Sequence, residues 1–173
     1  MKIFLIGFMG CGKSKLGKGF ASKFDKPFID LDDMVELTYQ MTIPDIFAAF
    51  GEHGFREKER DVLQSAAMDD DAIIATGGGA PCFFDNMEWM NKNGLTVFID
   101  SPVKVLADRL INARVERPLV KGKNMEQLME FIEMKLQERR PFYKQAQIVM
   151  KGVDLNADML MEAIEDYQKS KAH

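Results

Sequence analysis

The sequence is poor in cysteine, has no long hydrophobic run and carries little excess charge. Its two cysteines among 173 residues, Cys11 and Cys82, have neither the spacing of metal ligands nor that of a disulfide framework. We interpret both as small hydrophobic residues of a protein from a reducing compartment. No apolar stretch approaches the roughly 18 residues of a membrane-spanning helix, and the run at residues 3–6 is too short for a signal-peptide core. We therefore expect a cytoplasmic protein that does not bind membranes.

The charge balance is mildly acidic, with 23 lysines and arginines, 27 aspartates and glutamates, and a formal net charge of −4. This balance argues against a broad nucleic-acid surface, so we expect no nucleic-acid partner. The charges are unevenly distributed along the chain. Residues 28–75 hold three cations and twelve carboxylates, whereas residues 102–145 hold ten cations and six carboxylates. Taken alone, this pattern fits two solvated helical faces as well as it fits a functional division of the chain.

Short apolar runs alternate with amphipathic stretches along the whole chain. Residues 15–24 and 125–136 have helical spacing of apolar side chains, and a last amphipathic helix follows near the C-terminus. Ser101 and Pro102 suit the cap and the first position of another helix. Several runs are apolar at successive positions, as in strands that are buried on both faces of a parallel sheet. We predict a single α/β domain over residues 1–173 whose parallel sheet is flanked by helices. Its five strands are predicted at residues 3–6, 27–29, 72–75, 95–99 and 146–150.

A phosphate-binding motif directly follows the first predicted strand. Residues 7–14 read GFMGCGKS and match the pattern G-x-x-x-x-G-K-[ST] at a strand-to-helix turn, where its mechanism requires it. The glycines let backbone amides approach phosphate oxygens, and the start of the next helix adds its positive dipole end. We expect Lys13 to neutralise the β- and γ-phosphates of ATP and the Ser14 hydroxyl to be a ligand of Mg²⁺. The predicted nucleotide-binding residues of this loop are Gly10, Cys11, Gly12, Lys13, Ser14 and Lys15.

Carboxylates follow the second predicted strand. Because carboxyl ends of neighbouring parallel strands meet at one sheet edge, Asp30 and Asp32 should lie beside the phosphate loop. If the strand geometry continues, the two side chains share one side of it. Carboxylates at this place would repel phosphate unless one binds Mg²⁺ and another accepts a hydrogen bond from a neutral hydroxyl. The alternative is that Asp32 or Asp33 merely caps the next helix.

Two further groups have both a functional and a plain structural interpretation. Arg56 is suited to bidentate carboxylate recognition, and Glu59, three residues on, could hold it in place. By itself this spacing is more typical of an exposed ion pair on a helix. Gly77, Gly78 and Gly79 end the third predicted strand, where bare backbone either lets a ligand come close or forms a simple flexible turn.

The combined motifs resemble those of the shikimate kinase family, in family order and spacing over nearly the whole chain. The resemblance implies a P-loop fold like that of the nucleoside monophosphate kinases, with a substrate-binding insert at about residues 31–60 and a mobile lid at about residues 112–124. The motifs that carry it are residues 7–14, Asp30-Leu31-Asp32, Phe55-Arg56-x-x-Glu59, Gly77-Gly78-Gly79 and Arg117-Pro118-Leu119.

The resemblance also implies roles on the phosphate side. Asp30 corresponds to the residue that reaches Mg²⁺, and Asp32 to the carboxylate that binds the acceptor hydroxyls and is the proposed general base. Arg117, which precedes Pro-Leu, corresponds to the lid arginine that stabilises charge on the transferring phosphoryl group. Arg109 corresponds to the residue that stacks on adenine. Lys13, Asp32 and Arg117 are therefore the expected catalytic residues.

On the acceptor side, the resemblance assigns residues to the shikimate carboxylate. Arg56 corresponds to the arginine that clamps it, and Glu59 to the residue that orients Arg56. Arg139 corresponds to a second carboxylate-binding arginine in an Arg-x-Pro-Leu-Tyr pattern, although Phe142 replaces the leucine and Arg140 lies adjacent. The backbone of Gly77, Gly78 and Gly79 completes the expected acceptor site.

These observations predict a monomeric kinase that converts ATP and shikimate to ADP and shikimate 3-phosphate. A kinase of another small hydroxylated acid, such as gluconate, is the nearest alternative on this fold. A nucleoside monophosphate kinase fits less well, because the short insert leaves little room for a second base. A P-loop binding protein without catalytic activity is the alternative from a different functional class.

Overall fold

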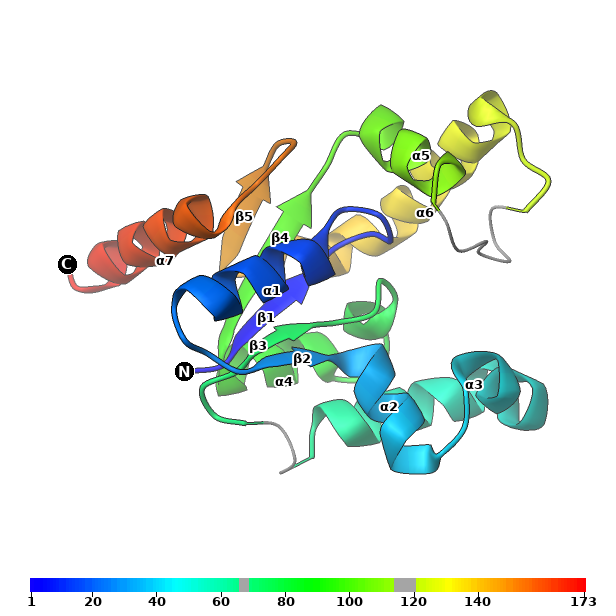
Figure 1. Ribbon diagram of the computed structural model, residues 1–173, viewed down its shortest axis with the longest axis horizontal. Coiled ribbons are helices and arrows are strands. Elements are labelled where there is room, and N and C mark those ends of the chain that lie inside the picture. Colours follow the sequence, from blue (N-terminus) through cyan, green and yellow to red (C-terminus); the bar gives the residue numbers. More distant parts are fainter. Residues whose placement is uncertain (66–68, 114–120) are drawn as a thin grey trace.

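The computed structural model describes residues 1–65, 69–113 and 121–173. Its centre is a five-stranded sheet in which every neighbouring pair is parallel, in the order β2-β3-β1-β4-β5 (Figure 1). This confirms the predicted fold class. The strands are β1 (Ile3–Ile6), β2 (Phe28–Asp30), β3 (Ile73–Ala75), β4 (Leu95–Asp100) and β5 (Ile148–Lys151).

Helices cover both faces of the sheet. In Figure 1, α1 and α7 lie together on the face turned to the viewer, and α4 and α6 lie behind it. No helix in the part of the chain that the structure describes is both long and apolar enough to cross a membrane. The helices are α1 (Lys13–Lys23), α2 (Leu31–Tyr39), α3 (Ile43–Leu63), α4 (Asn86–Asn93), α5 (Val103–Ile111), α6 (Met125–Tyr143) and α7 (Ala157–Lys171), with a short 3₁₀ turn at Ala80–Cys82.

The sequence pattern explains the core. All residues of β1 and β3 are buried, as expected for central strands that helices cover on both faces. In β5, at the edge of the sheet, buried and exposed residues alternate. Both cysteines are free; Cys11 is buried and Cys82 half-buried. The predicted strand positions are correct to within two residues at each end.

One predicted helix start is wrong. Ser101 does not cap α5: Pro102 has extended backbone angles (φ −59°, ψ 144°) and precedes the first helical residue, Val103. No side chain among the described residues caps this helix. A Ser-Pro pair can form the start of a helix or an extended segment that precedes a helix, because proline fixes φ but leaves ψ free.

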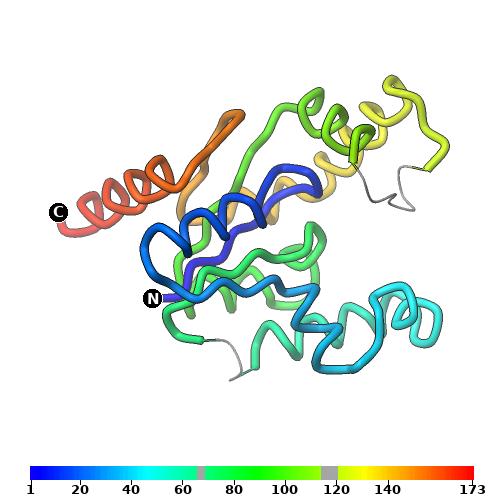
Figure 2. Tube along the Cα trace, viewed as in Figure 1, coloured from blue at the N-terminus to red at the C-terminus, as the bar shows by residue number. Residues whose placement is uncertain are grey.

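The pair α2–α3 projects from one end of the sheet (Figure 2). α2 starts directly at the carboxyl end of β2, and α3 returns the chain towards β3. A kink at Gly51 (φ 70°, ψ −177°) divides α3 into two helical parts. Glycine adopts this positive φ without the strain that a side chain would bring. The predicted substrate-binding insert, residues 31–60, falls on this pair.

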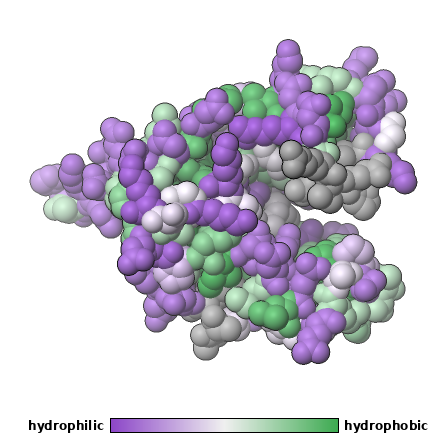
Figure 3. All heavy atoms as spheres, viewed as in Figure 1, coloured by the Kyte–Doolittle hydropathy of each residue, from purple (hydrophilic) through white to green (hydrophobic). Residues whose placement is uncertain are grey.

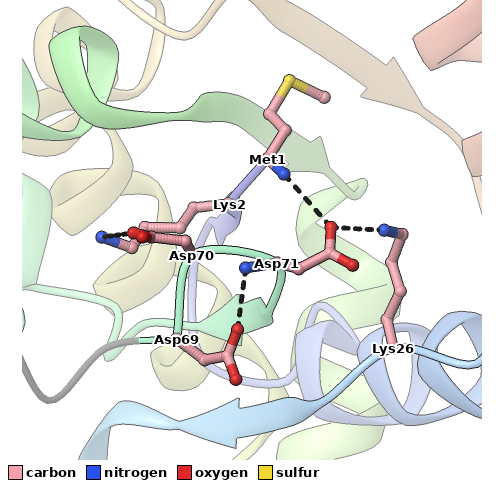
Figure 4. A network of polar contacts seen from close by, with 6 residues as sticks. All are labelled: Met1, Lys2, Lys26, Asp69, Asp70 and Asp71. Carbon is pink, nitrogen blue, oxygen red and sulfur yellow. Dashed lines mark hydrogen bonds and ion pairs between the residues drawn. The ribbon is translucent and has the colours of Figure 1, made fainter.

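Ion pairs account for an acidic run at the opposite end of the sheet (Figure 4). The Asp71 carboxylate accepts hydrogen bonds from the Met1 ammonium group at 3.1 Å and from Lys26 Nζ at 2.6 Å, and Lys2 pairs with Asp70 at 3.2 Å. Exposed pairs of this kind contribute little to stability. They lie near the amino ends of β1 and β3, so part of the negative charge of residues 28–75 is remote from the phosphate loop.

Candidate active site

The phosphate loop connects β1 to α1 in a conformation that depends on glycine. A Cβ atom on Gly7 (φ 149°) would lie 2.8 Å from the carbonyl oxygen of Ile99, and Gly12 (φ 95°) occupies the cap position of α1. Lys13, the first residue of α1, donates hydrogen bonds through Nζ to the carbonyl oxygens of Gly7 at 2.6 Å and Phe8 at 3.2 Å. The lysine is therefore folded over its own loop, above the helix start that attracts anions.

Ser14 and Asp30 meet beside this loop. The Ser14 hydroxyl donates to Asp30 Oδ2 at 3.1 Å, while Asp30 Oδ1 accepts from the backbone amides of Asp32 at 3.0 Å and Asp33 at 3.3 Å. Asp30 itself therefore caps α2, and the alternative in which Asp32 or Asp33 caps it is wrong. The expectation that Asp30 and Asp32 share one side of a strand is also wrong, because the strand ends at Asp30 and Asp32 is helical.

Arg56 and Glu59 form a buried ion pair. Arg56 Nη1 donates to Glu59 Oε1 at 2.9 Å, and the two side chains are only 11% and 1% exposed. The interpretation as an exposed helical pair is therefore wrong. Arg56 Nε and Glu59 Oε2 are buried without a hydrogen-bond partner in the described parts of the chain. Buried polar atoms without partners are costly, which indicates that this pair faces a ligand site.

The Arg56 guanidinium group lies against two aromatic rings and bare backbone. Its Cζ atom lies 4.4 Å from the ring centre of Phe83 and 5.1 Å from that of Phe55. A Cβ atom on Gly79 would lie 2.8 Å from the same Cζ, so the guanidinium group needs glycine there. Sequence reasoning missed Phe83, and no local signal could have found it, because its contact with Arg56 is formed only by the fold.

The other two glycines also lie against charged side chains. A Cβ atom on Gly77 would be 3.1 Å from Glu59 Oε2 and 3.3 Å from Asp32 Oδ1, so these two carboxylates flank its backbone. On Gly78, a Cβ atom would be 3.2 Å from Arg139 Nη1. The triple glycine is thus a surface against which acceptor-site side chains pack, which argues against a simple flexible turn.

Three adjoining cavities run along this edge of the sheet, and Figure 3 shows the molecule hollowed on the side where α2 and α3 project. The central cavity, about 370 Å³, is lined by residues of the phosphate loop together with Ser14, Asp30 and Asp32. A second cavity, about 170 Å³, shares Asp32 with it and is lined by both arginines of the predicted acceptor site. Residues that line this second cavity are Met9, Asp32, Ile43, Phe47, Phe55, Arg56, Glu59, Gly77, Gly78, Gly79 and Arg139.

The third cavity, about 260 Å³, continues from the phosphate loop on the other side. Arg109 lines both this cavity and the central one, and its Nη1 donates to the Gly10 carbonyl oxygen at 3.1 Å. Cys11 and Lys15 also line it. Sequence reasoning missed Asp154 and Leu155, which also line it. Their position just after β5 was the available signal, because carboxyl ends of parallel strands share one edge.

Of the two adjacent arginines of α6, only Arg139 lines the acceptor cavity. Its guanidinium group also lies 5.4 Å from the ring centre of Phe8 in the phosphate loop. This supports Arg139 over Arg140 as the acceptor-side arginine. Arg117 and most of the predicted lid at residues 112–124 lie outside the described residues.

Known proteins match both the sequence and this arrangement. The model of a protein family described as shikimate kinase matches residues 9–168. A shikimate kinase of Bacteroides thetaiotaomicron is 48% identical over 155 residues, which cover 90% of this chain and 89% of that protein. Another, of Phocaeicola vulgatus, is 46% identical over 170 residues, covering 98% of this chain and 97% of that protein. The chain belongs to the shikimate kinase family.

Solved structures of shikimate kinases have the same fold. The Bacteroides thetaiotaomicron enzyme superposes with a TM-score of 0.87 at 42% identity, covering 100% of this chain and 99% of that one. A shikimate kinase from Acinetobacter baumannii, solved in complex with shikimate, gives a TM-score of 0.78 at 31% identity, covering 99% and 93%. The family resemblance inferred from the motifs is therefore confirmed along nearly the full length of the chain.

Because Glu59 is a buried carboxylate, the stability of this shikimate kinase family member should depend on pH. Burial raises the pKa of Glu59 to about 6 from 4.5, a rise that the positive charge of Arg56 limits and the negative charge of Asp32 supports. As the pH rises, the unfolded chain therefore loses this proton first, and ionisation favours unfolding. Between about pH 4.5 and 6 this one group should lower the free energy of unfolding by about 2 kcal/mol.

Urea unfolding of the wild type and of Glu59→Gln, at about pH 4.5 and about pH 7, measures this contribution. The stability of Glu59→Gln relative to the wild type should be about 2 kcal/mol greater at the higher pH than at the lower. An equal difference at both pH values would show that Glu59 keeps an ordinary pKa in the folded protein.

Proposed function

We propose that this chain transfers the γ-phosphoryl group of ATP to the 3-hydroxyl of shikimate, acting with Mg²⁺ as a cytoplasmic monomer without a nucleic-acid partner. One observation carries the proposal. The phosphate-loop cavity and the cavity around the buried Arg56–Glu59 pair adjoin, and Asp32 lines both of them. A nucleotide phosphate and an anionic acceptor bound in these cavities would meet at Asp32. Membership of the shikimate kinase family supports shikimate as the acceptor.

The nucleotide extends across two of the cavities in this proposal. Its phosphates occupy the central cavity, where the loop amides, the amino end of α1 and Lys13 supply positive charge. On binding, the Lys13 ammonium group exchanges its bonds to the Gly7 and Phe8 carbonyl oxygens for phosphate oxygens. The adenine occupies the third cavity against Arg109, whose planar guanidinium group suits stacking on a base. Arg117 is proposed to add its charge when the lid closes.

Ser14 and Asp30 are the residues that we propose hold Mg²⁺. The Ser14 hydroxyl donates to the Asp30 carboxylate at 3.1 Å, so two oxygen donors converge at the wall of the phosphate cavity. Mg²⁺ takes oxygen ligands and usually combines one or two protein side chains with substrate phosphates. When bound, the ion neutralises charge on the β- and γ-phosphate oxygens. The donor set therefore fits the ion.

Asp32 is proposed to orient the acceptor hydroxyl and accept its proton. Its side chain lies between the phosphate cavity and the acceptor cavity, and its Oδ1 lies against the backbone of Gly77. An alcohol is a poor nucleophile at neutral pH, so positioning a single hydroxyl in line with the γ-phosphorus should supply most of the acceleration. The remaining part comes from positive charge around the transferring group.

The acceptor carboxylate is proposed to bind between Arg56 and Arg139. These arginines belong to α3 and α6, far apart in sequence, and both line the same cavity. Arg56 keeps one guanidinium edge on Glu59 and is immobilised by its aromatic neighbours, so little side-chain entropy is lost when the substrate binds. Two convergent guanidinium groups suit a carboxylate, which accepts bidentate hydrogen bonds.

A coupled assay of ADP release tests the proposal against its nearest alternative. With ATP and Mg²⁺ present, shikimate should stimulate ADP release strongly and gluconate should not. Stimulation by gluconate alone would favour the kinase of another hydroxylated acid. ATP binding without turnover on either acceptor would favour a binding protein.

Removing the acceptor clamp should weaken shikimate binding far more than ATP binding. We expect Arg56→Ala to raise the KM for shikimate by about 100-fold, since truncating one partner of a buried charge pair costs about 2–5 kcal/mol. Gly79→Ala should act in the same direction, because the added Cβ displaces the guanidinium group from its packed position. Arg60→Ala is the matched control: Arg60 lies on the same helix but pairs with Asp61 and does not line the cavity. Unchanged shikimate affinity of Arg56→Ala in calorimetry would refute this acceptor site.

A further inference from the structure

A tyrosine hydroxyl is buried directly behind the acceptor cavity. Tyr143, the last residue of α6, is 0% exposed, and its hydroxyl donates to the Gly78 carbonyl oxygen at 2.5 Å. Its ring packs on Phe98 of β4 with ring centres 5.0 Å apart. A phenylalanine would make the same ring contact without bringing a polar atom into the core. The hydroxyl therefore needs an explanation other than packing.

Arg139 lies four residues earlier on α6, one helical turn away, and therefore on the same face of the helix as Tyr143. Burial raises the pKa of Tyr143, so the phenol keeps its proton, although Arg139 opposes the shift. Its single proton is donated to Gly78, so the oxygen presents only lone pairs to the positive charge of Arg139. The hydroxyl thus joins an α6 side chain to the backbone of the triple-glycine loop.

Both partners of the hydroxyl belong to the acceptor cavity. Gly78 and Arg139 line it, whereas Tyr143 itself does not. The two groups also pack closely, since a Cβ atom on Gly78 would lie 3.2 Å from Arg139 Nη1. A long arginine side chain loses much rotamer freedom when it is held in one orientation. The Gly78 backbone, itself fixed by Tyr143, restricts the guanidinium group before the substrate binds, so less freedom is lost on binding.

We propose that Tyr143 is a positioning residue for the phosphoryl acceptor. Its side chain keeps the Arg139 guanidinium group and the Gly78 peptide in a fixed relation to each other, so that both face the part of the cavity where the acceptor carboxylate binds. This inference rests on the proposed function. Tyr143 acts through Arg139 and does not touch the substrate itself. Its loss should therefore affect the acceptor and leave the nucleotide largely unaffected.

Steady-state kinetics of Tyr143→Phe with both substrates test this role. We expect the KM for shikimate to rise about tenfold, as for the loss of one buried hydrogen bond, while the KM for ATP changes less than about twofold and kcat less than about threefold. In an Arg139→Ala background, Tyr143→Phe should add less than about twofold to the KM for shikimate. Tyr167→Phe, the same chemical change on α7, should alter neither KM.

Thermal unfolding separates positioning from a merely structural role. Ile164→Val shortens a buried side chain of α7 and provides a protein that is destabilised away from the cavities. It should keep the wild-type KM for shikimate even where its melting temperature falls as far as that of Tyr143→Phe. The inference is overturned if Tyr143→Phe leaves the KM for shikimate unchanged, raises both KM values equally, or keeps its full effect without Arg139. A wild type without shikimate-dependent turnover overturns the proposed function instead.

Discussion

Replacing Asp32 by asparagine should lower kcat by about two to four orders of magnitude, the range associated with a positioned general base. The carboxylate lies where the phosphate cavity and the acceptor cavity adjoin, so it can receive the proton of a hydroxyl that faces the γ-phosphorus. Asparagine has nearly the same shape and can still accept a hydrogen bond, but it cannot take the proton. Shikimate affinity should consequently fall much less than kcat.

The coupled ADP assay gives kcat, and calorimetry with shikimate gives the affinity. Asp33→Asn provides the matched control, because Asp33 is the adjacent carboxylate on α2 and its side chain is exposed and lines neither cavity. It should stay within about twofold of the wild type. A kcat for Asp32→Asn within about fivefold of the wild type would mean that another group accepts the proton or that none is needed.

Replacing Lys13 by alanine should lower kcat/KM for ATP by about a thousandfold. Its Nζ is 2.6 Å and 3.2 Å from two carbonyl oxygens of the phosphate loop. Phosphate oxygens can replace these two carbonyl partners without any movement of the helix. A single preorganised charge or donor at a developing phosphoryl charge contributes about 10²–10³ in rate, and loss of ground-state phosphate binding adds to this.

Measuring kcat and the KM for ATP separately will show how this loss is divided. Both should change, since Lys13 contacts phosphate in the ground state and in the transition state. Lys18→Ala is the control on the same helix, with an exposed side chain that lies over the ring of Phe28, and it should leave both constants within about twofold. If Lys13→Ala turned over ATP at the wild-type rate, the phosphate loop would have no part in the mechanism.

Much of the fold could be predicted because its signals are local. Central strands that are buried on both faces must be apolar at successive positions, and the phosphate loop must carry glycine where φ is positive, as at Gly12. The helix start at Ser101 and Pro102 was wrong because the same dipeptide suits two backbone conformations. The strand-like pairing of Asp30 with Asp32 was wrong because capping by Asp30 starts α2 one residue after the strand.

The acceptor site depends on contacts between distant segments, and here sequence alone was insufficient. The spacing of Arg56 and Glu59 is the same in an exposed pair and in a buried one, so only the packing of α3 against the triple-glycine loop distinguishes them. Phe83 and Tyr143 likewise gain their partners through the fold. The family motifs identified the arginine and carboxylate positions, and the structure supplied what holds them.

The most direct test of the central claim is to identify the phosphorylated product. Incubation with ATP, shikimate and Mg²⁺ followed by ³¹P and ¹H NMR should show one new phosphomonoester on the 3-hydroxyl of shikimate, formed in equal amount to ADP. Removing Mg²⁺ with a chelator should stop its formation. Inorganic phosphate in place of the ester, or an ester at another hydroxyl, would contradict the proposed placement of the acceptor at Asp32.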